Sequence, residues 1–380
     1  MTLKSIACID DLRRLAHRNV PREFMDYYES GSYSESTLRS NSEDLAKLKI
    51  RQRVLAGASD RDLSQSLLGE ALSLPLALAP IGMTGMACRD GEIAAARAAE
   101  KAGIPYALST LSICSIEDVA AVAQKPFWFQ LYFMKDRGFT ADLIARARAA
   151  NCSALVLTAD LQVLGQRNRD VHNGMTIPPR IGLQTIAHVL SKPAWVAGVL
   201  LGKRKSFGNV QGYIPGTEHL GSYMEWINSQ FDQALSWKDV GWIRERWPGK
   251  LIIKGILDVE DAREAVSTGA DAIVVSNHGG RQLDGAPSSI SILPRVADAV
   301  GAETEILFDG GIRSGQDVFR ALALGARACL LGRAYLYGIC AAGEEGASKA
   351  IDIIKNELDV TMALAGVRRI GDIGRTSLVS

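Results

Sequence analysis

The sequence of 380 residues is poor in cysteine, has no excess of either charge and contains no long apolar run. Its six cysteines lie far apart without a CxxC pair, which argues against a disulfide framework and predicts reduced core thiols. Lys and Arg number 43 against 42 Asp and Glu, and a net charge of +1 offers no basic field to nucleic acid. We therefore expect no nucleic-acid partner.

Segments for export or for crossing a membrane are missing as well. The stretch 181–201 comes closest to the roughly 20 uninterrupted apolar residues that span a bilayer, but polar residues and a proline interrupt it. The first ten residues lack the basic stretch and apolar run of a signal peptide. The sequence therefore predicts a globular protein that faces the cytoplasm.

From about residue 74, short apolar runs alternate with longer Ala-rich stretches of helical spacing, which is the pattern of βα units. The apolar runs predict eight strands, at residues 74–79, 105–108, 127–131, 154–157, 251–253, 272–275, 305–308 and 328–331. The other stretches predict helices at residues 92–101, 116–123, 141–150, 237–246, 259–267, 289–299, 315–322 and from 334 onward. Eight units in series favour an α/β fold, a closed (β/α)8 TIM barrel, over an open sheet.

Two regions depart from the repeat, within what we interpret as one domain of residues 1–380 with its barrel at 74–345. Residues 1–70 predict an N-terminal helical extension that acts as a lid or plug. Residues 162–236, after the fourth strand, form a long insertion that carries Pro, Gly, Trp and a basic run. Long insertions without a regular repeat tend to be functional or mobile.

Hydrogen-bonding residues follow almost every predicted strand, at the end of the barrel where such folds build their active sites. Polar strand ends can also arise simply because loops are polar. In strand order, the candidates are Pro80, Ile81 and Gly82; Ser109; Gln130 and Tyr132; Thr158 and Asp160; Lys254; Ser276 and His278; Asp309, Gly311 and Arg313; Gly332 and Arg333.

The last two strands end in Asp309-Gly310-Gly311-Ile312-Arg313 and Gly332-Arg333. Glycines let backbone N–H groups approach an anion, and two guanidiniums can hold it with paired hydrogen bonds. Barrels commonly bind phosphate at this location, whereas the alternative is a pair of plain glycine turns. We therefore expect a phosphorylated cofactor or substrate.

His278 and Arg281 flank a Gly pair after the sixth strand, which places a proton acceptor and a carboxylate-binding cation in one pocket. The competing interpretation of a lone His is structural, but the neighbouring glycines and Arg281 favour a functional one. The other histidines, His17, His172, His188 and His219, lack such a setting. No HxxxH or Cys/His cluster is present, so we expect no metal.

Lys254 ends the fifth strand in a buried apolar run and therefore needs a partner anion. That partner can be a substrate carbonyl in a Schiff base or the negative charge of a cofactor ring, unless the side chain only extends to the barrel mouth. Asp160 is the candidate to orient a histidine and stabilise its charged form, and Arg167 follows shortly after it.

Several segments in order resemble the family of FMN-dependent (S)-2-hydroxy acid dehydrogenases and oxidases, which includes bacterial quinone-linked L-lactate dehydrogenases. The resemblance covers essentially the whole chain and is most specific at the longest segment. The segments are Asp26-Tyr27-Tyr28-Glu29-Ser30-Gly31, Phe129-Gln130-Leu131-Tyr132, Leu157-Thr158-Ala159-Asp160, Ile253-Lys254-Gly255, Ser276-Asn277-His278-Gly279-Gly280-Arg281-Gln282-Leu283-Asp284 and Asp309-Gly310-Gly311-Ile312-Arg313.

The resemblance implies a role for each candidate. His278 would be the base, paired with Asp160, while Arg281 and Arg167 would hold the substrate carboxylate. The hydroxyls of Tyr27 and Tyr132 would donate hydrogen bonds to the carboxylate and the substrate oxygen, and Lys254 would lie near the pyrimidine end of the flavin. The isoalloxazine would contact Pro80, Ile81, Gly82, Ser109, Gln130, Thr158 and Ser276, and the ribityl phosphate would contact Asp309, Gly311, Arg313, Gly332 and Arg333.

Finer expectations concern the electron acceptor and the substrate. Gly82 stands where soluble oxidases of the family usually have Ala, so we favour a dehydrogenase that passes electrons to a membrane quinone or another non-oxygen acceptor. Segment 181–212 resembles the membrane-binding segment of the quinone-linked members and predicts a peripheral protein on the cytoplasmic side of the inner membrane. A lid over the barrel or a neighbouring subunit, in a cytoplasmic protein, is the alternative. The family also suggests a homotetramer.

L-lactate is the expected substrate and pyruvate the product. (S)-mandelate or a longer aliphatic acid is the alternative, because Leu111 occupies a position that varies with substrate size in the family. Two other functions stay open: a soluble oxidase that makes hydrogen peroxide, and a barrel that binds a phosphate ligand or a partner without turnover.

Overall fold

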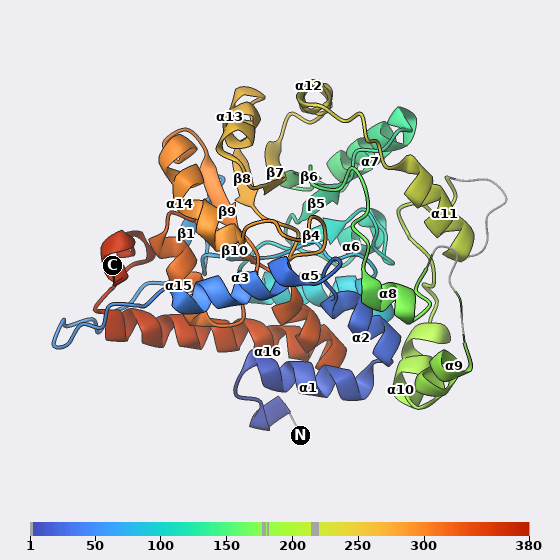
Figure 1. Ribbon diagram of the computed structural model, residues 1–380, viewed down its shortest axis with the longest axis horizontal. Helices are drawn as coiled ribbons and strands as arrows, with labels where there is room; N and C mark the ends of the chain where they lie inside the picture. Colours follow the sequence, from blue (N-terminus) through green and yellow to red (C-terminus); the bar gives the residue numbers. More distant parts are fainter. Residues whose placement is uncertain (1–2, 177–179, 181, 214–219, 380) are drawn as a thin grey trace.

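The computed structural model describes residues 3–176, 180, 182–213 and 220–379, and its centre is a parallel eight-stranded barrel (Figure 1). The strands are β3 (Leu76–Leu78), β4 (Ala107–Ser109), β5 (Trp128–Leu131), β6 (Ala154–Thr158), β7 (Lys250–Ile256), β8 (Ala272–Val275), β9 (Glu305–Phe308) and β10 (Ala328–Leu331). They pair in the order β3-β10-β9-β8-β7-β6-β5-β4, and a bridge between Leu78 and Tyr106 brings the two ends together. The TIM-barrel prediction is confirmed.

The barrel strands are apolar because side chains on both of their faces are buried. Every residue of β3, β4, β5, β6, β8 and β10 is buried. One face of each strand fills the barrel interior and the other packs against the outer helices, so the strands show continuous apolar runs instead of alternation. This double burial explains why each predicted strand overlaps an observed one.

The outer helices are α5 (Gly91–Ala102), α6 (Ile116–Ala120), α7 (Arg137–Ala149), α12 (Trp237–Arg246), α13 (Val259–Ser267), α14 (Ser289–Val300), α15 (Gly315–Ala323) and α16 (Arg333–Ala365). Side-chain caps start several of them: the Ser115 hydroxyl accepts from the backbone N–H of Asp118, and Ser314 does so from Asp317. A kink at Ala342 and Gly343 bends α16, which packs against α1, α5 and α15 (Figure 1). A short helix, α4 (Thr84–Ala87), follows β3.

The N-terminal extension is only partly helical. It contains α1 (Ile9–Asn19), α2 (Arg22–Glu29) and α3 (Ser36–Lys47), but then a β-hairpin of β1 (Gln65–Leu67) and β2 (Glu70–Leu72), which the sequence prediction missed. Leu67 and Leu72 are buried together with Trp128 and Ala154, at the starts of their strands. The hairpin therefore closes the amino-terminal end of the barrel because two leucines complete its apolar interior.

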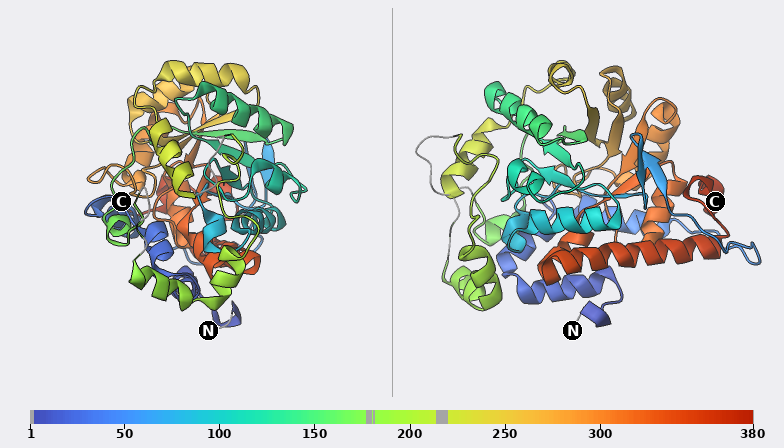
Figure 2. Two further views of the ribbon diagram at one scale, coloured as in Figure 1. Left: turned by 90° about the vertical axis from the view of Figure 1, so that its right-hand side faces the viewer. Right: turned by 180° about the vertical axis from the view of Figure 1, so that it is seen from behind.

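The insertion after β6 packs beside α2, on one side of the barrel (Figure 2). Its described elements are α8 (Asn168–His172), α9 (Leu183–Leu190), α10 (Pro193–Trp195), a π-helical turn (Val196–Leu200) and α11 (Leu220–Gln230). Residues Pro193 to Leu200 are helical, because α10 continues directly into the π-helical turn. Among the described residues, no helix has the length and apolarity needed to cross a membrane.

All six cysteines are free, as expected for reduced thiols. Four of them are buried: Cys114, Cys152, Cys329 and Cys340. Cys8 and Cys88 are only partly buried, so the prediction that the cysteines are core residues is correct for the other four.

Glu29 on α2 makes the stability of the fold depend on pH. Burial raises its pKa, but hydrogen bonds and charge from Arg13 and His17 outweigh this effect and lower the pKa to about 2. A carboxyl whose pKa falls on folding contributes stability above its unfolded value of 4.5, and that contribution disappears as the pH falls towards 2. Because Arg13 is half exposed, we expect roughly 2 kcal/mol at neutral pH.

Urea unfolding of the wild type and of Glu29→Gln, measured between pH 7 and pH 2.5, tests this expectation. The difference in free energy of unfolding should shrink below about pH 4.5. A difference that stays constant with pH would contradict it.

Candidate active site

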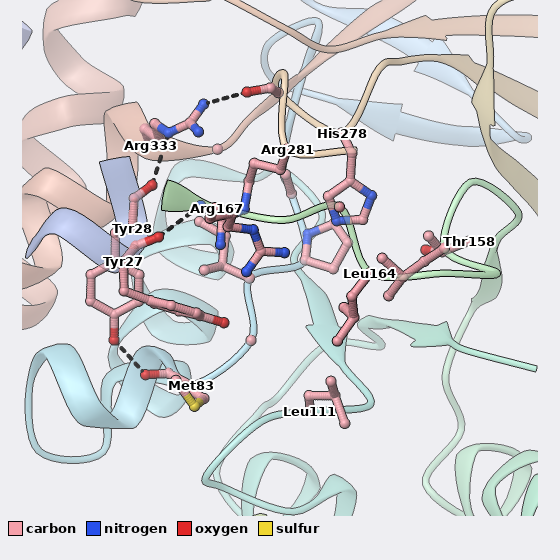
Figure 3. Close-up of a pocket in the computed structure, with 18 of the residues that line it drawn as sticks. Tyr27, Tyr28, Met83, Leu111, Thr158, Leu164, Arg167, His278, Arg281 and Arg333 are labelled. Carbon is pink, nitrogen blue, oxygen red and sulfur yellow. Dashed lines mark hydrogen bonds between the residues drawn. The ribbon is translucent and has the colours of Figure 1, made fainter. Parts of the chain in front are cut away.

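Most predicted site residues line one cavity of about 350 Å³ at the carboxyl ends of the strands. Figure 3 shows Tyr27, Arg167, His278 and Arg281 close together in it, with Leu111 and Leu164 nearby. The predicted residues on its wall are Tyr27, Pro80, Ile81, Gly82, Tyr132, Thr158, Arg167, Lys254, His278, Arg281, Asp309, Gly311, Arg313, Gly332 and Arg333.

The other predicted residues are Asp160, Ser109, Gln130 and Ser276, which are not part of the wall but contact it or each other. Gln130 and Ser109 are buried and share a hydrogen bond of 3.2 Å between their side-chain oxygens. Ser276 accepts a hydrogen bond of 2.9 Å from Lys254. Asp160 contacts His278. These four residues form a layer behind the residues that line the cavity.

His278 and Asp160 form the central pair. The Nδ1 atom of His278 lies 2.8 Å from Oδ1 of Asp160, which leaves Nε2 as the ring nitrogen that can face a substrate. His278 has a left-handed backbone, with φ of 58°, a strained conformation for a non-glycine residue that is often found at functional sites. Burial raises the pKa of Asp160, but the charges of His278 and Lys254 outweigh it, so the net pKa is lowered and the carboxylate stays ionised.

Two arginines give the pocket a positive wall beside Tyr27. The guanidinium of Arg281 lies 5.1 Å from the Tyr27 ring centre, and that of Arg167 lies 5.8 Å from it. Burial and the charge of Arg167 lower the pKa of Arg281 to about 10. Asp170 is the acidic neighbour of Arg167, 3.5 Å away. The two guanidiniums have only one carboxylate, that of Asp170, beside them. The remaining positive charge can bind an anion.

Lys254 has an anionic partner within the protein, which argues against the Schiff-base interpretation. Its ammonium lies 2.9 Å from Oδ2 of Asp309 and donates to Ser276, with only 4% of the residue exposed. Burial lowers its pKa, but the charges of Asp309 and Asp160 outweigh burial and raise it. A protonated amine cannot act as a nucleophile.

Arg333 lies deeper than the sequence implied. Its guanidinium donates hydrogen bonds to the carbonyls of Tyr28, Gly279 and Ser30 at 2.9–3.0 Å. Burial and the charges of Arg281 and Arg313 lower its pKa to about 9. Arg333 thus joins α2 to the His278 loop, in addition to lining the pocket.

Apolar residues of the insertion form the part of the wall that sequence reasoning missed. They come from irregular chain or short helices, so no periodic pattern marks them. Tyr28, which donates from its hydroxyl to the carbonyl of Met83, was also not assigned to the site. These residues are Leu164, Val171, Met175, Phe207, Ile227 and Phe231, and Leu161 adjoins them just before the insertion.

Comparisons with known proteins agree with this arrangement. The sequence profile described as FMN-dependent dehydrogenase matches residues 16–380. The chain is 50% identical to an L-lactate dehydrogenase of Stenotrophomonas maltophilia (strain K279a), over 99% of both chains. It is also 50% identical to one of Pseudomonas aeruginosa (strain LESB58), over 98% of both.

Solved structures show the same similarity. The crystal structure of monotopic membrane protein (S)-mandelate dehydrogenase superposes with a TM-score of 0.94 and 35% identity, covering 99% of both chains. A mandelate oxidase structure superposes with a TM-score of 0.83 and 36% identity, covering 99% of this chain and 98% of the other.

Proposed function

The chain belongs to the FMN-dependent dehydrogenase family, and from that premise we propose that it oxidises L-lactate to pyruvate and passes electrons to a membrane quinone or another acceptor than oxygen. The substrate assignment is supported by sequence identity, which is 50% to the L-lactate dehydrogenases but 35% to the mandelate dehydrogenase. The proposed reaction depends on one observation above all: the His278–Asp160 pair at 2.8 Å in a pocket that also contains Arg281 and Arg167.

The residues around Lys254 fit FMN. Buried polar atoms that lack a partner within the described part of the chain include Nε2 of Gln130 and Oδ1 of Asp309, a donor and an acceptor suited to the edge and the side chain of a flavin. Gly311 has a positive φ of 88° and, with Arg313, can hold the phosphate at the end of β9. When bound, FMN supplies a two-electron acceptor.

The chain's own residues bind the acid and move a proton. Arg281 and Arg167 hold the substrate carboxylate, which fixes its hydroxyl-bearing carbon near His278. His278 takes a proton from the substrate on Nε2, and the charge of Asp160 stabilises the imidazolium that results. Tyr132 keeps its proton, because burial and the charge of Asp160 raise its pKa, and can donate to the substrate oxygen.

Visible spectroscopy without oxygen tests the proposal. The purified protein should be yellow, and L-lactate should bleach it, whereas (S)-mandelate and glycolate should bleach it far more slowly. Bleaching by mandelate alone would keep the reaction and replace the substrate. A protein that does not bind FMN would overturn the proposal.

The choice of acceptor depends on Gly82. A Cβ at this position would lie 3.3 Å from the carbonyl oxygen of Leu111, so the methyl group that soluble oxidases of the family usually have would fit here only tightly. In air, the protein should form much less than one hydrogen peroxide for each L-lactate that it oxidises. Stoichiometric peroxide would favour the soluble oxidase instead.

A membrane surface is the proposed site of electron transfer, and within segment 181–212 the exposed apolar residues of α9 support it. Leu183 is 87% exposed and Leu190 68%, on one face of α9, and Leu201 is 75% exposed after the π-helical turn. Trp195 instead faces the barrel, where its Nε1 donates to the carbonyl of Met86. Arg204 also faces the protein, paired with two aspartates. Ile181 lies outside the described residues.

Replacing Leu183, Leu190 and Leu201 together by Ser should lower the affinity for anionic lipid vesicles about 100-fold, because three exposed side chains lose apolar area that enters the interface. Co-sedimentation with vesicles measures this. The matched control is Val360→Ser with Leu364→Ser, since these residues of α16 are 53% and 56% exposed but lie outside the insertion. Equal sedimentation of wild type and triple variant would exclude the membrane surface and favour a cytoplasmic protein.

Assembly as a homotetramer stays a prediction from the resemblance. Sedimentation equilibrium of the purified protein tests it. A mass near 160 kDa, about four times the 40.9 kDa of the chain, is the expected result.

A further inference from the structure

Asn41 on α3 forms a buried amide pair with Asn277, the residue before His278. Asn41 is 1% exposed and Asn277 5%. Nδ2 of Asn41 donates to Oδ1 of Asn277 at 2.8 Å, and Nδ2 of Asn277 donates to Oδ1 of Asn41 at 2.7 Å. Two short reciprocal bonds away from water are costly to break, because each broken bond leaves an unpaired polar group in the interior.

Asn41 also contacts the neighbouring strand ends. Its Oδ1 accepts from the backbone N–H of Ser289, the first residue of α14, at 3.2 Å. A Cβ on Gly311 would lie 2.4 Å from the carbonyl oxygen of Asn41, so the loop after β9 and α3 are in direct backbone contact. Asn41 therefore occupies the junction of the loops that follow β8 and β9.

Asn277 connects Asn41 to the loop that contains His278. Its Oδ1 accepts from the backbone N–H of Gly280, and its own N–H donates to the hydroxyl of Ser289. These bonds fix the residues on both sides of His278, whose φ of 58° is unfavourable for a residue with a Cβ. Such a conformation persists only where the surroundings determine it.

We propose that Asn41 is a positioning residue, which acts through Asn277 to hold His278 in its strained backbone conformation with Nε2 facing the substrate. The proposal rests on the proposed function, because it takes His278 to be the base. Arg281 at the end of the same loop is held separately, by the carbonyls of Tyr27 and Ser30. Substrate binding should therefore depend less on Asn41 than proton transfer does.

The test uses Asn41→Asp, which keeps the volume and the acceptor for Ser289 but removes the donor to Asn277. We expect kcat for L-lactate to fall about 10- to 100-fold, because a small displacement of a reacting group is enough for such a loss, while KM changes less than about threefold. FMN content and melting temperature of the purified protein report on folding. Asn41→Ala replaces it if Asn41→Asp does not fold.

A double-mutant cycle with His278→Gln separates positioning from a general structural role. If Asn41 acts through His278, its replacement causes no further loss in the His278→Gln background, measured as the rate of anaerobic bleaching. The matched control is Asn209→Ala, since Asn209 is equally buried but hydrogen-bonds to Ser112 and to the backbone around β4. Its effect should be the same in both backgrounds.

Additive losses for Asn41→Asp and His278→Gln would overturn the proposal, and so would a rise in KM with unchanged kcat. A wild type that L-lactate and the other hydroxy acids fail to bleach would instead refute the proposed function. The two failures are therefore distinguishable.

Discussion

His278→Gln should slow the reduction of bound FMN by L-lactate about 10³- to 10⁴-fold while the protein stays folded and yellow. The reason is that Nε2 of His278 is the proposed proton acceptor, and a positioned general base contributes up to about 10⁴-fold. Gln keeps the approximate volume of the ring and can still donate to Asp160, so the change removes basicity more than packing. Anaerobic stopped-flow absorbance measures the rate.

Two companion variants sharpen this expectation. Asp160→Asn retains an acceptor for Nδ1 but removes the charge that stabilises the imidazolium, and we expect about a 100-fold loss. His172→Gln, on the exposed end of α8, should leave the rate unchanged. A His278→Gln protein that bleaches within tenfold of the wild type would show that another group takes the proton.

Lys254→Met should release FMN and destabilise the fold. The substitution removes the cation 2.9 Å from Asp309 and leaves a buried carboxylate without its partner, which costs about 3–5 kcal/mol. It also removes the positive charge expected beside the flavin, and a lost hydrogen bond to a charged group lowers affinity about 10- to 100-fold. Fluorescence titration with FMN and thermal unfolding of the apoprotein measure the two effects.

The double variant Lys254→Met with Asp309→Leu separates stability from cofactor binding. Replacing both charges with apolar groups should restore most of the melting temperature, because a buried ion pair can be exchanged for apolar packing at little cost. FMN affinity should stay low. If FMN binds the single variant as tightly as the wild type, Lys254 does not contact the cofactor.

The barrel could be predicted from sequence because its strands are buried on both faces and therefore appear as apolar runs at regular intervals. The hairpin β1–β2 could not, since its two strands are three residues long and bury one leucine each against residues far along the chain. The helices α8, α9 and α11 were missed for a related reason. They lie outside the βα repeat: α8 is only five residues long, and α9 has no buried residue and exposes Leu183 and Leu190.

The site was predictable where a rule of the fold applies. Polar residues after parallel strands converge, and this rule brought His278, Lys254 and Asp309 into one pocket from different strands. Asn41 had no such signal. Its partner Asn277 is 236 residues away in the chain, and an asparagine in a surface-like helical stretch does not reveal a distant hydrogen bond.

The carbonyl of Ser30 accepts hydrogen bonds from both Arg281 and Arg333, which follow it by 251 and 303 residues. Contacts at such sequence separation form late, because a long loop must close before they can be made. At a synthesis rate of about 5–20 residues per second, α2 spends at least about 15 seconds on the ribosome before Arg333 is made. The nascent chain therefore carries α2 without a pocket, and the cavity that this helix helps to line forms only when the last barrel strands are complete.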